Sequence, residues 1–191
     1  WQMALQKKNG SFGPTAPVQP MPLANQLSES GLAFTPAFRH YFGHLPELSL
    51  PEMTVRYETS FDCSYDGLVE LVMEPGSLRG DWTVRINNAP PLTRETFGPT
   101  SAHVRGSRGV DITTALRSGT NTIIVEVTTD RLDGGLLNPL YLAGRFGVAL
   151  SPLSIAPPQV NGAFERYVDN LLPYYAGAID YTMHFDLDAV P

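Results

Sequence analysis

The chain of 191 residues contains 42% hydrophobic residues, 17 glycines and 17 prolines, and its net charge is −6. The length fits one globular domain with extensions, and the scattered glycines and prolines indicate many turns between short elements. The sequence shows no run of basic residues and no apolar stretch near the roughly 18 residues of a membrane span, which argues against nucleic acid and membrane as partners.

Residues 1–50 are predicted to be an irregular leader that packs along the domain. Four prolines from Pro14 to Pro22 lie in a polar stretch that neither a helix nor a central strand tolerates well. A short helix is compatible with residues 24–42, although Pro36 interrupts it.

From Met53 onward the pattern changes to period two, which is typical of strands with one buried face. The predicted strands cover residues 53–61, 68–73, 81–87, 102–105, 122–128 and 140–150. Residues 110–116 are predicted to form one helical turn, capped by Asp111 or Thr113. Short strands separated by Gly/Pro turns predict an all-β fold, a two-sheet antiparallel β-sandwich of the jelly-roll type.

The space between the two sheets is predicted to be filled from residues 81–87 and 122–128. The inward side chains would be Trp82, Val84, Ile86, Ile123, Val125 and Val127. The sandwich would span residues 51–155, and residues 156–191 would form a linker and a further strand.

That further strand repeats an earlier pattern, because residues 179–186 (IDYTMHFD) resemble residues 55–62 (VRYETSFD). A constant offset close to a domain length suggests the opening strand of a second, related module. The alternative is that residues 178–188 form the last strand of the single sandwich. The sequence leaves both open.

Two segments resemble galactose-binding-domain-like jelly rolls of glycoside hydrolases, including the sugar-binding domains of family 2 β-glycosidases and the accessory domains of α-L-rhamnosidase-like enzymes. Residues 80–88 (GDWTVRINN) are similar to the pattern G-x-W-x-V-x-x-N-G, and residues 111–127 to D-I-T-x-x-L-x-x-G-x-N-x-I-x-V-x-V. Residues 173–181 (PYYAGAIDY) are similar to a P-Y-Y-S-G-x-x-x-Y opening. The sequence departs from the family at Asn88, which is usually glycine, and at Ala176, which is often serine.

The resemblance implies a noncatalytic accessory module that binds a carbohydrate or supports the cleft of a larger glycoside hydrolase. The catalytic residues would lie elsewhere, and the partner would be a glycan or the catalytic domain of the same polypeptide. An extracellular, periplasmic or cell-surface location follows by analogy only. A purely structural module without ligand is the main alternative, and a small glycosidase is a more remote one.

Sugar binding requires aromatic faces that stack on C–H groups and polar side chains that bind hydroxyls. The predicted carbohydrate-binding residues are Arg79, Phe97, His103, Arg105, Arg108, Asp130, Arg131 and Tyr141. No cofactor is expected apart from a structural calcium ion, for which Asp130 and Asp133 in one loop are the candidate ligands.

Overall fold

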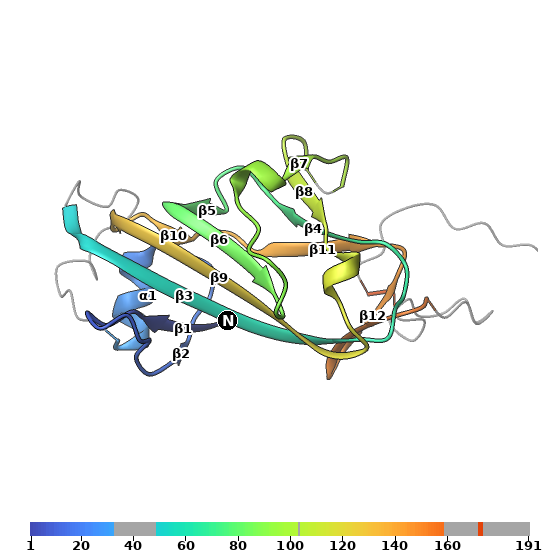
Figure 1. The fold of residues 1–191 in the computed structure, drawn as a ribbon, viewed down its shortest axis with the longest axis horizontal. Helices are drawn as coiled ribbons and strands as arrows, with labels where there is room; N and C mark the ends of the chain where they lie inside the picture. Colours follow the sequence, from blue (N-terminus) through green and yellow to red (C-terminus); the bar gives the residue numbers. More distant parts are fainter. Residues whose placement is uncertain (33–48, 103, 159–171, 174–191) are drawn as a thin grey trace, which may run out of the picture.

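The computed structural model describes residues 1–32, 49–102, 104–158 and 172–173. This part of the chain is mostly β, with several antiparallel sheets, and it confirms the predicted all-β sandwich (Figure 1).

The larger sheet is built on two long strands, β3 (Ser49–Cys63) and β9 (Gly119–Arg131). They pair in antiparallel register along nearly their whole length, and β6 (Asp81–Ile86) pairs with the other edge of β9. β-Branched and aromatic residues alternate with polar ones in all three strands, as expected for a sheet with one buried face. Figure 1 shows the three strands running side by side across the molecule.

The second layer is a four-stranded sheet in the order β11-β4-β8-β7. Its strand β4 (Val69–Met73) is the most buried of the four, since four of its five residues are buried. The other strands are β11 (Leu140–Gly144), β8 (Arg108–Asp111) and the short β7 (Gly98–Pro99). A separate two-stranded ribbon joins β5 (Leu78–Arg79) to β10 (Gly135–Leu136).

The predicted inward side chains do face the interior, but all six lie in one sheet. Trp82, Val84 and Ile86 of β6 are paired with the alternating residues of β9, Val127, Val125 and Ile123. Five of the six are buried and Trp82 is partly exposed. The opposite wall of the core comes from β4, whose buried residues include Val69, Leu71 and Met73.

The first 32 residues, which were predicted to be irregular, contain two short strands and a helix. β1 (Gln2–Leu5) pairs with β3, β2 (Ala16–Pro17) pairs with β1, and α1 (Leu23–Ser30) packs its buried residues against the core. The path between these elements is irregular, in keeping with the prolines. No helix in the described ranges has both the length and the apolar character needed to cross a membrane.

α1 is tied to the large sheet by a buried side-chain contact. Tyr57 of β3 donates its hydroxyl hydrogen to Oε1 of Gln26 at 2.8 Å. Gln26 in turn donates to the carbonyl oxygens of Gln19 and Leu136. Tyr57 and Gln26 are both fully buried, so this contact joins three segments that are distant in sequence.

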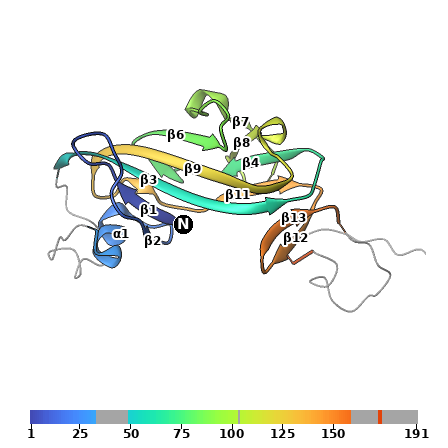
Figure 2. The same ribbon diagram turned by 60° about the horizontal axis from the view of Figure 1, so that its bottom comes forward.

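The structure corrects two of the predicted strands. Residues 140–150 are not one strand, because β11 ends at Gly144. The chain then forms β12 (Gly147–Leu150), which pairs with β13 (Leu153–Ala156) in the other sheet. A Cβ on Gly144 would lie 2.6 Å from the carbonyl oxygen of Leu68, so only glycine fits at this close approach. Figure 2 shows the β12–β13 hairpin turned away from the plane of β3 and β9.

The segment 102–105 is the second correction. In its described residues the chain forms bends and turns, with Val104 accepting a hydrogen bond from the backbone N–H of Ser107, and the strand is β8 instead. Of the helical turn predicted for residues 110–116, the part at Thr113–Ala115 is confirmed as a 3-10 turn, whereas Val110 and Asp111 belong to β8. Asp111 accepts a hydrogen bond from the N–H of Thr113 at its start.

Candidate functional site

A groove of about 510 Å³ opens between the turn that follows β4 and the loops that follow β6 and precede β8. We call it the rim groove. Its wall combines one aromatic ring with charged, polar and apolar groups, and the residues that line it are Met73, Glu74, Pro75, Gly76, Ser77, Leu78, Trp82, Arg94, Glu95, Gly106 and Arg108.

Trp82 provides the aromatic surface of the rim groove. It is the first inward-facing residue of β6, and its ring remains partly exposed. The ring of Phe97 meets it edge to face, with centroids 5.6 Å apart and planes at 78°. The guanidinium carbon of Arg94 lies 5.8 Å from the Trp82 centroid. The tryptophan is therefore held by packing on one side and stays accessible on another.

The arginines of the rim groove come from two different loops. Arg108 is anchored by a hydrogen bond from its guanidinium group to the carbonyl oxygen of Phe97. Arg94 lies in the 3-10 turn Arg94–Thr96 and is exposed. A guanidinium group carries five N–H donors in a planar fork, so both side chains offer donors suited to hydroxyl or carboxylate oxygens.

The carboxylates of the rim groove are Glu74 and Glu95. The side chain of Glu95 accepts a hydrogen bond from the hydroxyl of Thr93 at 2.6 Å, which holds the pKa of Glu95 below its ordinary value. Glu74 accepts a hydrogen bond from the hydroxyl of Tyr141 at 3.4 Å. Burial, followed by the negative charge of Glu74, raises the pKa of Tyr141 above its ordinary value.

Ser77 adds a polar group without a protein partner. Its residue is 1% exposed, and its hydroxyl forms no hydrogen bond within the described residues. The hydroxyl of Ser107, next to the groove residues Gly106 and Arg108, is in the same state. Buried hydroxyls normally bind a protein group or water, and because both oxygens are inaccessible from outside, a ligand in the open groove does not reach them in this conformation.

Of the predicted binding residues, Arg79 and Arg131 lie together at one end of the large sheet. Nη1 of Arg79 is 2.5 Å from Oδ2 of Asp133, and Nε of Arg131 is 2.8 Å from Oδ1 of the same carboxylate. The hydrogen bond from Arg131 is the main reason that the pKa of Asp133 is lowered. This ion-paired cluster lies outside the rim groove.

The same cluster argues against the predicted calcium site. Asp130 is exposed, and the carboxylate of Asp133 is already bound by two positively charged groups. A cation there would displace those arginines at an electrostatic cost. In the described ranges, no group of three or more His, Cys, Asp and Glu side chains is arranged to hold a metal ion.

The remaining predicted residues are dispersed. Arg108 lines the rim groove, whereas Phe97 is 1% exposed and supports the groove from below without offering a stacking face. Arg105 is exposed in the neighbouring loop, and Tyr141 does not line the groove but is hydrogen-bonded to its residue Glu74. His103 lies outside the described residues.

Sequence reasoning missed Arg94, Glu74 and the accessible face of Trp82. The period-two pattern predicts a core position for Trp82, because it lies on the same face of the strand as Val84 and Ile86. Its position as the second residue of the strand, next to the strand's end, signalled that the covering layer could end before it.

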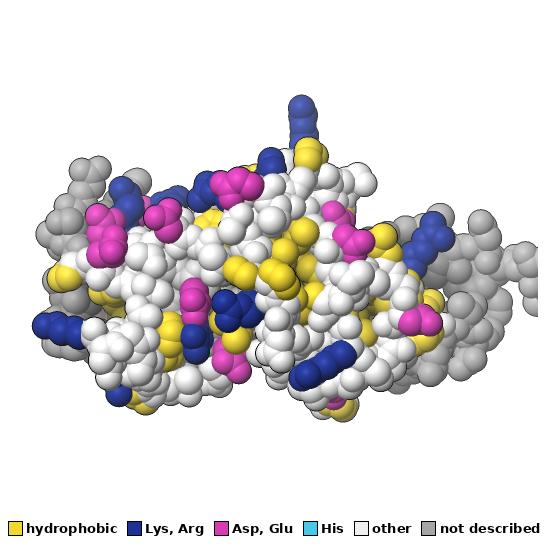
Figure 3. Space-filling model, viewed as in Figure 1, with side chains coloured by type: hydrophobic (Ala, Val, Ile, Leu, Met, Phe, Trp, Pro, Cys, Tyr) yellow, Lys and Arg dark blue, Asp and Glu magenta, His cyan; other side chains and the backbone are white. Residues whose placement is uncertain are grey.

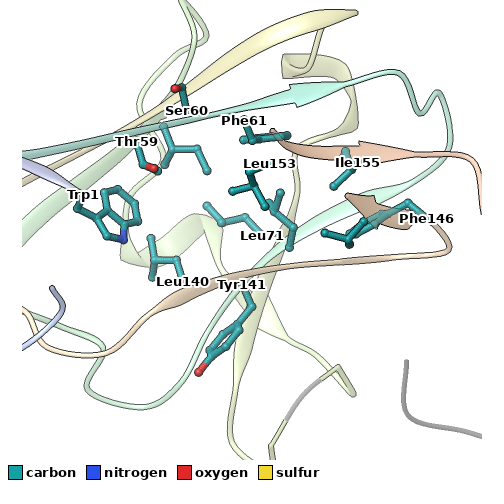
Figure 4. A pocket seen from close by; sticks show the side chains of 13 residues that line it. Trp1, Thr59, Ser60, Phe61, Leu71, Leu140, Tyr141, Phe146, Leu153 and Ile155 are labelled. Carbon is teal, nitrogen blue, oxygen red and sulfur yellow. The ribbon is translucent and has the colours of Figure 1, made fainter. Parts of the chain in front are cut away.

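A second hollow of about 660 Å³ lies between the two sheets, and we call it the interlayer pocket. Its lining is mainly apolar and comes from β3, β4, β9, β11, the β12–β13 hairpin and Trp1. Figure 4 shows Phe61, Leu71 and Leu153 converging on it, while the ring of Tyr141 points away. Among the described residues no carboxylate lines it, so it suits an apolar occupant.

Figure 3 shows one face of the molecule, with side chains of both signs spread over it and hydrophobic side chains gathered near its centre.

No known protein-family model matches the chain, and no curated protein is similar to it in sequence.

Proposed function

We propose that this domain is a noncatalytic module that binds a glycan in the rim groove and belongs to a larger glycoside hydrolase. The observation that carries the proposal is the partly exposed ring of Trp82, flanked by guanidinium and carboxylate groups within one open groove. A sugar ring presents C–H groups on one face and hydroxyls around its edge, which this combination of aromatic and charged side chains complements.

The charge balance of the groove favours a neutral sugar. Arg94 and Arg108 supply donors, and Glu74 and Glu95 supply acceptors, so the two signs are matched. Hydroxyl groups donate and accept at once and use both kinds of side chain, whereas an anionic ligand would meet the two carboxylates. The similarity of residues 80–88 and 111–127 to sugar-binding jelly rolls supports the same interpretation.

The direct test is titration of the chain with galactose, rhamnose and plant oligosaccharides, followed by calorimetry or by NMR shifts. Trp82→Ala should weaken binding by roughly three- to tenfold, the energy of one aromatic stacking contact, and Trp82→Phe should retain part of it. Arg94→Ala should also weaken binding, because its side chain is exposed and its loss leaves the core intact.

Arg85→Ala is the matched control, because Arg85 is exposed in the same strand but outside the rim groove. Its affinity should equal that of the unaltered chain. A chain that binds none of these glycans, or one whose affinity is the same with and without the Trp82 ring, would contradict the proposal.

A catalytic role would need a protonated carboxyl group as well as a carboxylate. The pKa of Glu95 is lowered, which suits it poorly to donate a proton at neutral pH. Chromogenic glycosides provide the test: turnover abolished by Glu74→Gln, or by Asp130→Ala or Asp111→Ala, would replace a binding role with an enzymatic one.

The structural alternative, an interdomain module without ligand, is favoured by a different observation. Leu68, Leu150 and Leu153 are 62%, 51% and 50% exposed, and Leu153 lines the interlayer pocket. Exposed leucines beside an apolar hollow are typical of a surface that packs against other protein.

A further inference from the structure

The edge of β3 that lies beside the interlayer pocket is incompletely paired. β1 pairs with Val55–Glu58 along this edge, and β13 pairs with Asp62 and Cys63. Among the described residues, no strand pairs with Thr59–Phe61 on this side, and Thr59, Ser60 and Phe61 all line the pocket. Trp1 and Leu153 flank the opening (Figure 4).

Strand geometry identifies the backbone groups that this gap exposes. The carbonyl of Thr54 accepts a hydrogen bond from Gln6, and the N–H of Ser64 donates to Ile155, so even-numbered residues of β3 direct their backbone groups to this edge. The N–H and C=O of Ser60 therefore point into the gap. Those of Thr59 and Phe61 point to β9, their antiparallel neighbour.

An occupant of the gap is constrained by this arrangement. A residue that exchanges both hydrogen bonds with Ser60 has its side chain on the outer face, as Ser60 does, because directly opposed residues share a face. The residues before and after it then point inward, beside Thr59 and Phe61, into the apolar pocket. Val84 and Leu92 already form a single bridge of this type elsewhere in the domain, with hydrogen bonds of 2.9 and 2.7 Å. The gap thus requires an apolar-polar-apolar sequence.

The chain itself carries this pattern downstream of β13, which forms one wall of the pocket. Ile179, Tyr181, Met183 and Phe185 alternate with polar residues, and the whole segment lies outside the described residues. The connection, residues 159–178, spans up to about 3.3 Å per residue and is long enough to return to the gap.

We propose that residues 179–185 dock at this gap, with one polar residue bridged to Ser60 and its two apolar neighbours in the interlayer pocket. Every register that meets the pattern places Tyr181 or Met183 in the pocket. The docked segment covers the exposed backbone groups of Ser60 and part of the apolar lining, which an open edge would leave to water or to another chain.

The test is residue-resolved amide hydrogen exchange in the full 191-residue chain. The Ser60 amide should exchange at least about tenfold more slowly than an open edge allows. The double variant Tyr181→Asp/Met183→Asp should remove that protection. The amides of Thr59 and Phe61, which are bonded to β9, should stay protected and report that the sandwich is intact.

Thr182→Asp/His184→Asp is the matched control, because it adds the same charge to the polar face of the segment and should leave Ser60 protected. The proposal is overturned if Ser60 exchanges freely in the unaltered chain, or if the first variant leaves its protection unchanged. Protection that rises with protein concentration would assign the gap to a second copy and would also overturn it.

Crosslinking decides the matter if the charged variants unfold. Leu153→Cys combined with Tyr181→Cys or Met183→Cys should form a disulfide in the full chain, because the pair can then approach within the 7 Å Cα separation that the bond needs. Leu153→Cys with Thr182→Cys should not. Equal crosslinking of all three pairs, or of none, would refute docking in this orientation.

Discussion

The contact between Tyr57 and Gln26 makes a quantitative prediction about how the helix is held on the sheet. Tyr57→Phe removes the hydroxyl that donates to Gln26 Oε1 at 2.8 Å and leaves the ring packing unchanged. Both residues are fully buried, so the amide oxygen loses its partner where water does not replace it. The Gln26 amide nitrogen keeps its bonds to Gln19 and Leu136.

We expect a loss of about 1–3 kcal/mol in the free energy of unfolding, the usual cost of a buried polar atom without a partner. For a domain of this size, that loss lowers the melting temperature by roughly 2–4 °C per kcal/mol. Urea denaturation followed by tryptophan fluorescence measures the first quantity, and calorimetry measures the second. A change below about 0.5 kcal/mol, the range of ordinary surface substitutions, would refute the reasoning.

The same tyrosine gives the effect a pH dependence. Burial raises the pKa of Tyr57 above its ordinary value of 10.0. The unfolded chain therefore releases this proton first, and the stability that the neutral hydroxyl confers is complete below pH 10 and decreases as the pH rises above it. Tyr57→Phe should remove this part of the alkaline loss. An identical alkaline profile in the variant would show that Tyr57 does not cause it.

Three further substitutions test separate parts of the fold. Asn121→Ala should lower the free energy of unfolding by about 1–3 kcal/mol, because the buried amide is hydrogen-bonded to the backbone of Arg117 and Gly119 and to the side chain of Asn87. In the same denaturation assay, the control Asn88→Ala, at an exposed residue, should lower it by less than about 0.5 kcal/mol. Gly80→Ala should destabilise by at least about 1 kcal/mol, since φ is +122° and a Cβ would lie 2.6 Å from a backbone oxygen; an unchanged melting temperature would contradict this. Asp133→Asn should lower the free energy of unfolding by less than about 1 kcal/mol, because the ion pairs of Asp133 are near the surface. Since the pKa of Asp133 is lowered in the folded state, this difference in stability should disappear as the pH falls below 3.8. A difference in stability that persists in acid would show that packing causes it.

The period-two patterns were sufficient to predict the central strands. β4, β6 and β9 fall within one to three residues of the predicted ends, and the alternation identified Val84, Ile86, Val125 and Val127 as inward-facing. This succeeds because a side chain in a strand has only two faces, so the buried positions can be identified from the sequence alone. The turn at Asp111 was likewise predictable, since a short acidic side chain bonds its neighbouring backbone locally.

The candidate site could not be predicted in the same way, because its parts come from segments far apart in the chain. The rim groove joins Glu74, Trp82, Arg94 and Arg108, and nothing in the local pattern of any one of them indicates the others. Asp133 illustrates the same limit: its loop suggested a cation site, but the fold brings Arg79 to its carboxylate across 54 positions of sequence.

The sequence by itself therefore determined the strands and their buried faces, because both depend on local periodicity. The tertiary structure decided the rest: the strand and helix within residues 1–32, the division of residues 140–150 between two sheets, and the gap at Ser60. Each of these depends on which distant backbone supplies a hydrogen-bond partner or a close contact. That choice is made when the two layers pack and is not encoded in any short segment.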